Sequence, residues 1–92
     1  MSRAIITFKV MPEDAGVDLE SIKAECKKIA QEAGSIGEML IEEQPIAFGL
    51  KAVIVKAMYD VEGGDFDAIA QKMSTIDRVQ TADVAGMDLP LG

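Results

Sequence analysis

The sequence contains no histidine and only one cysteine, Cys26. The lack of histidine removes the commonest acid–base group and metal ligand at neutral pH. A single cysteine allows neither an internal disulfide nor a zinc site built on thiolates. Cys26 itself lies on the apolar stripe of an expected helix, which indicates a buried core thiol rather than a nucleophile. We therefore expect no enzymatic chemistry, no metal and no cofactor.

Basic residues are also scarce, with nine lysines and arginines against sixteen acidic residues and a net charge of −7. Such a chain repels phosphate backbones, so direct nucleic-acid binding is not expected. No apolar run approaches the roughly 20 residues of a membrane span, and no signal peptide is apparent. These features predict a cytoplasmic protein without a membrane segment. Since only 4% of residues are aromatic, the core must be aliphatic.

The length of 92 residues predicts one domain, residues 1–92. Residues 3–11 alternate between apolar and polar side chains, which is typical of a half-buried strand that Pro12 ends. Residues 50–59 are nearly continuously apolar and β-branched, which favours a central strand. Residues 35–46 predict a less regular strand, and Pro45 favours either an edge position for it or the end of the strand. Residues 77–87 predict the last strand, with a bulge near Asp83 where the alternation slips.

Two helices are expected between these strands. Asp18 is a good N-cap for a helix of about four turns that ends at Gly34. Gly63 and Gly64 break the chain before a shorter helix capped by Asp65. The order strand, helix, strand, strand, helix, strand favours an α+β, ferredoxin-like βαββαβ sandwich. Its four-stranded antiparallel sheet would carry both helices on one face.

Phe48 is the aromatic residue without an obvious place in the core. It lies in the segment QPIAFGLK, residues 44–51, where Pro45 stiffens the chain and Gly49 permits an unusual backbone angle. The ring could fold over the edge of the core as a staple. It could equally be an exposed anchor for a partner, because aromatic residues on rigid loops are favoured binding hot spots.

The C-terminal segment is the second unusual feature. Met87, Leu89 and Leu91 are apolar, and Pro90 interrupts the segment in which they lie. These residues could frame the end of the last strand or offer an apolar contact to a partner. The sequence pattern leaves both interpretations open.

Three segments in order resemble the exchange domain of the elongation factor 1-beta family, in its short archaeal form. They are residues 5–12 (IITFKVMP), 45–51 (PIAFGLK) and 79–87 (VQTADVAGM). The resemblance implies a guanine-nucleotide exchange domain that acts on the GTPase elongation factor 1-alpha. Eukaryotic members end in a lysine that reaches the magnesium site of the GTPase, whereas the matching residues here are Asp88, Leu89 and Pro90.

The resemblance also implies which residues meet the GTPase. The turn aromatic would reach its second domain, and the closing segment would lie against its nucleotide-binding domain. The implied contact residues are Pro45, Phe48, Gly49, Lys51, Asp83, Met87, Asp88 and Leu89. We expect the free protein to be a monomer. The alternative from another class is a small regulatory ligand-binding module that acts as a dimer, a common use of this fold.

Overall fold

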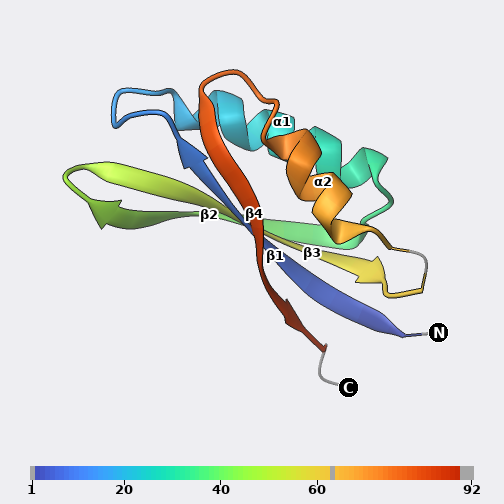
Figure 1. Cartoon of the computed structure of the whole chain (residues 1–92). Helices are drawn as coiled ribbons and strands as arrows, with labels where there is room; N and C mark the ends of the chain where they lie inside the picture. The colour runs from blue at the N-terminus through green and yellow to red at the C-terminus, as the bar shows by residue number, and fades with distance from the viewer. Residues whose placement is uncertain (1, 63, 90–92) are drawn as a thin grey trace.

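The computed structural model describes residues 2–62 and 64–89. Four strands and two helices follow one another in the predicted order (Figure 1). In chain order the elements are β1 (Arg3–Pro12), α1 (Leu19–Glu32), β2 (Ile36–Ala47), β3 (Leu50–Asp60), α2 (Phe66–Met73) and β4 (Val79–Asp88). Within these residues, no helix combines the length and apolar character that crossing a membrane demands.

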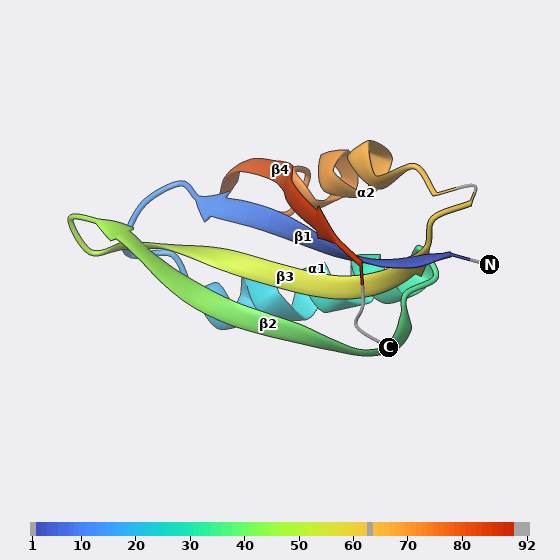
Figure 2. The ribbon, with the colours of Figure 1, turned by 90° about the horizontal axis from the view of Figure 1, so that it is seen from below.

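The strands form one antiparallel sheet in the order β2-β3-β1-β4. Both helices cover the same face, so that the strands lie in front of them when the molecule is seen from below (Figure 2). This arrangement confirms the ferredoxin-like α+β sandwich. It also confirms that β3 is central and that β2, which contains Pro45, is an edge strand.

The core lies between the sheet and the helices. Alternate residues of β1 are completely buried, with Ile6 and Phe8 among the largest side chains there. Cys26 is also fully buried, on the stripe of α1 that faces the sheet. The Tyr59 hydroxyl donates a hydrogen bond to the Ala30 carbonyl at 2.9 Å, which joins β3 to the end of α1. Tyr59 therefore satisfies its polar atom inside an otherwise apolar layer.

The helix ends follow from local sequence. The Asp18 carboxylate accepts a hydrogen bond from the Glu20 amide at 3.1 Å, and Asp65 accepts one from the Ala68 amide at 3.1 Å. Each bond satisfies one of the free donors of a first helical turn. Gly34 has a φ of 98°, which an L side chain rarely adopts, and it ends α1. Gly63, which the sequence predicts to break the chain together with Gly64, lies outside the described residues.

The last strand differs in detail from its prediction. It begins at Val79 rather than at residue 77, because Asp77 and Arg78 form a turn in which Arg78 has a φ of 71°. The register with β1 shifts between Thr7 and Phe8, which leaves Ala85 as the extra residue. The bulge therefore lies two residues beyond the predicted Asp83. The alternation of apolar and polar residues locates the bulge only approximately, because alanine and glycine contribute little to that pattern.

Candidate functional site

A two-residue turn connects β2 to β3 and carries the candidate anchor. Phe48 has a φ of 53° and Gly49 a φ of 78°, so both central residues are left-handed. Two left-handed residues make the hairpin turn whose twist matches that of the flanking strands. Gly49 adopts this conformation without steric cost, but for Phe48 it is unfavourable. The turn therefore has a bulky residue where folding would prefer asparagine or glycine.

The Phe48 ring makes no compensating contact with the core. Its exposed fraction is 103%, as in an extended chain, and neighbouring Ile46 is 41% exposed. The staple interpretation is therefore wrong, since a staple would cover apolar neighbours. An exposed aromatic ring on a strained backbone has no folding rationale here, and such outliers concentrate at functional sites.

Pro45 and Lys51 lie at the base of this turn, where they face each other across the two strands. The register shifts by one residue between Pro45 and Ala47. Lys51 is half exposed, and its Nζ lies 3.8 Å from Glu43 Oε1. Pro45, Phe48, Gly49 and Lys51 are thus brought together within one hairpin.

The predicted residues of the C-terminal segment lie along β4 and just beyond it. Asp83 pairs with Lys9, and both side chains point to the sheet face without helices. Met87 pairs with Ile6 and is 53% exposed, whereas Leu89 is 75% exposed. Pro90 and Leu91 lie outside the described residues. Two apolar side chains are therefore offered to solvent at the end of β4.

The structure separates these two groups of residues. Asp88 pairs with Ile5 at the beginning of β1, whereas the hairpin turn extends past the other end of that strand (Figure 2). Met87, Asp88 and Leu89 therefore lie toward the end of the sheet away from the turn, whereas Asp83, which pairs with Lys9, lies midway between them along the strands. A single partner would therefore meet the turn and the end of β4 at two separate places.

The Cys26 thiol belongs to neither group and lies in the core. Burial raises the pKa of the Cys26 thiol to about 12, with a smaller contribution from nearby Glu25, so that the thiolate is suppressed. Among residues 2–62 and 64–89, no three potential ligand side chains are grouped to hold a metal ion. The exposed side chains of both sets of residues can form contacts with another macromolecule.

Sequence reasoning missed the ion pairs that brace these elements. Lys23 Nζ on α1 lies 2.5 Å from Glu43 Oε2 on β2 and 2.8 Å from Glu20 Oε2. Arg78 binds Glu13 at 3.0 Å and Asp14 at 3.3 Å. Lys23 and Glu43 are 20 residues apart, and Arg78 is 65 residues from Glu13 and 64 from Asp14. Periodicity detects no such pair, because it reads one element at a time.

The fold and these exposed groups define a small ferredoxin-like domain whose unusual residues are directed to solvent. Comparison with known proteins identifies the family of this domain. Residues 5–89 match the EF-1 guanine nucleotide exchange domain. The chain belongs to that family, and its role is guanine-nucleotide exchange in translation elongation.

Three archaeal relatives match this chain over nearly their whole length. The elongation factor 1-beta of Methanosphaerula palustris is 39% identical over 89 residues, which cover 97% of this chain and 99% of the relative. That of Archaeoglobus fulgidus is 33% identical with the same coverage. That of Methanothermobacter thermautotrophicus is 39% identical over 85 residues, 91% of this chain and 92% of the relative.

Proposed function

We propose that the chain promotes GDP release from elongation factor 1-alpha by binding that GTPase, without chemistry of its own. Phe48 is the anchor, and Pro45, Gly49 and Lys51 shape and flank its turn. The observation that supports this role is the fully exposed aromatic ring on a left-handed backbone. The exposed ring adds nothing to the stability of the fold. Its burial in a pocket of the GTPase would stabilise the complex.

The end of β4 is the second contact. Met87 and Leu89 provide apolar surface, and Asp83 and Asp88 point from the same strand toward the open face of the sheet. Because the two contacts lie at opposite ends of one sheet, they reach different parts of the GTPase. One contact anchors the protein, and the other lies against the nucleotide-binding domain.

Exchange then follows from linkage. A protein that binds the empty GTPase more tightly than its GDP form weakens GDP binding by the same factor. No residue of the exchange factor needs to touch GDP for this effect. The net charge of −7 further favours a basic surface on the partner and disfavours nucleic acid. We propose a monomer that works in the cytoplasm, without a cofactor and without binding membranes or nucleic acid.

The decisive measurement is the release of labelled GDP from elongation factor 1-alpha, chased with excess unlabelled nucleotide. We expect catalytic amounts of this protein to raise the release rate and Phe48→Ala to abolish most of the gain. An unchanged release rate at saturating concentrations of the protein would refute the proposed function.

A further inference from the structure

The outer half of the Phe48 hairpin receives little support from the core. None of residues 42–49 is buried. Behind the hairpin, a hollow of about 170 Å³ separates its base from the β1–α1 connection, with Leu19, Glu43 and Gly49 among the residues that line it. Apolar packing is what normally fixes the direction of such an arm. The direction of the Phe48 hairpin must therefore be fixed by an interaction other than apolar packing.

One polar link joins this arm to the helices. Glu43 points to the helix-covered face, because it pairs with the buried Val53. Its Oε2 accepts a hydrogen bond from Lys23 Nζ on α1 at 2.5 Å. In the part of the chain that the structure describes, no other side-chain hydrogen bond or ion pair joins residues 42–49 to any element but β3.

The link is built more firmly than an ordinary surface pair. Glu20 holds the same Lys23 ammonium at 2.8 Å, one helical turn earlier, so the lysine is fixed from two sides. The side chains of Lys23 and Glu43 are only 24% and 32% exposed. The hydrogen bond from Lys23 lowers the pKa of Glu43, and those to Glu20 and Glu43 raise the pKa of Lys23. The pair is therefore fully charged around neutral pH.

We propose that Glu43, held by Lys23, is a positioning residue that fixes the direction of the hairpin and so presents Phe48 to the GTPase. The inference rests on the proposed role of Phe48 as anchor. An arm that is ordered before binding loses less conformational entropy when the complex forms. Releasing the arm would weaken the complex although the Phe48 ring itself is unchanged.

Glu43→Gln is the direct test, because it removes the charge and keeps the shape. We expect the affinity for elongation factor 1-alpha to fall by about threefold to tenfold, the cost of ordering one or two additional side chains. The amide order parameters of residues 46–50 should fall in the free protein. Lys23→Gln should reproduce both effects, whereas Lys23→Arg, which retains the cation, should not.

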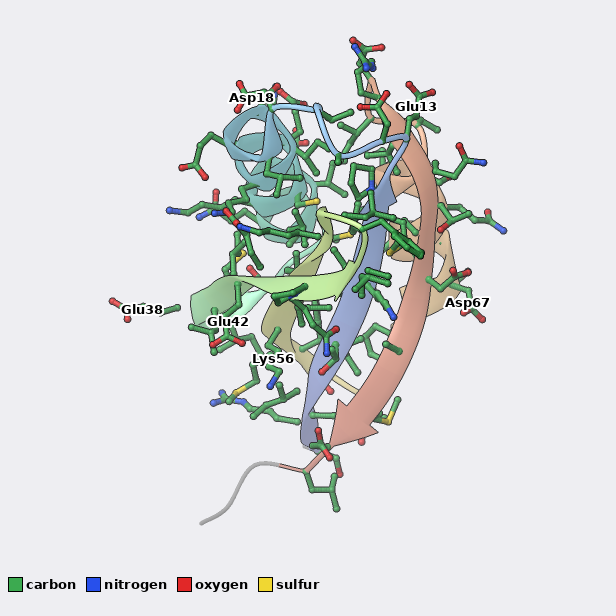
Figure 3. All side chains as sticks on the ribbon, turned by 90° about the vertical axis from the view of Figure 1, so that its left-hand side faces the viewer. Glu13, Asp18, Glu38, Glu42, Lys56 and Asp67 are labelled. Atoms are coloured by element: carbon green, nitrogen blue, oxygen red, sulfur yellow. The ribbon has the colours of Figure 1, made fainter. Side chains whose placement is uncertain are left out.

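Glu42→Gln is the matched control. It makes the same chemical change at the neighbouring position, but Glu42 lies on the sheet face away from α1, as does Lys56 (Figure 3). Neither affinity nor order parameters should change. An equal loss in Glu42→Gln would show a general effect of net charge and would overturn the inference.

A double-mutant cycle separates positioning from direct contact. If Glu43 acts through the anchor, Glu43→Gln should cost nothing further in a Phe48→Ala background. A full additional loss there would show that Glu43 touches the GTPase itself, and would overturn the inference. A silent Glu43→Gln beside an effective Phe48→Ala would overturn this inference alone, whereas a silent Phe48→Ala would overturn the anchor as well.

Discussion

Phe48 offers a substitution that is expected to weaken binding without weakening the fold. The ring is fully exposed, so Phe48→Ala removes no buried surface. Its free energy of unfolding should stay within about 0.5 kcal/mol of the wild type. Phe48→Gly also relieves the left-handed backbone at a φ of 53°, which costs an L residue about 1–2 kcal/mol. The greater conformational freedom of glycine in the unfolded chain offsets about 0.4–1 kcal/mol of this gain in stability. Phe48→Gly should therefore be as stable as the wild type or slightly more so.

Binding should respond to the loss of the ring in both variants. Truncation of an aromatic hot spot costs about 2–4 kcal/mol, which raises the Kd by roughly thirtyfold to seven-hundredfold. Urea unfolding followed by circular dichroism gives the first quantity, and calorimetric titration of nucleotide-free elongation factor 1-alpha gives the second. A loss of more than 1 kcal/mol of stability with unchanged Kd would refute the reasoning, because it would assign the ring to folding.

Three further predictions concern the hairpin and the core. Gly49→Ala forces a side chain into a φ of 78° and should lower the free energy of unfolding by about 1 kcal/mol; an unchanged urea midpoint would contradict this. Because Cys26 is fully buried and burial raises its pKa to about 12, a thiol reagent at pH 8 should label it only as fast as the protein unfolds; native-state labelling at the rate of the urea-unfolded chain would contradict the assignment. The pKa of Glu43 is lowered from 4.5, so the contribution of the ion pair is complete above that pH and is lost only as the pH falls through the lowered value. At high pH the contribution is lost as the pH rises through the raised pKa of Lys23, above 10.5. An NMR titration of the Glu43 carboxyl with its midpoint at or above 4.5 would rule out the pairing.

The fold could be predicted from the sequence because its main signals are local. Alternation in residues 3–11 identifies β1, and the burial of every second residue there confirms it. Asp18 and Asp65 mark the helix starts because capping involves only residues two or three positions apart. Pro45 lacks an amide hydrogen to donate, which left an edge position or a strand end for its segment, and β2 is an edge strand.

The site was less accessible to such reasoning. Proline, phenylalanine and glycine near one another predict a turn, but they do not say whether the ring folds back or points outward. The direction of the ring depends on the handedness of the turn, which is set by the backbone angles of Phe48 and Gly49. The identities of these two residues do not give those angles. The contact between Lys23 and Glu43 joins residues 20 positions apart. It exists because α1 packs against both β3 and β2, and neither segment signals this alone.

The separation of the two proposed contacts has a consequence for mechanism. In the proposed complex, Phe48 and Leu89 are joined by the central strands β1 and β3, whose core-facing residues are completely buried or nearly so. A stiff connection of this kind fixes the distance between two sites on the GTPase and can favour one arrangement of its domains over another. The differential affinity for that arrangement is the whole source of the exchange effect. A flexible hairpin would adapt to both the empty and the GDP-bound arrangement and would erase the difference. We therefore expect the ion pair at Glu43 to affect the rate of GDP release more than the stability of the free protein.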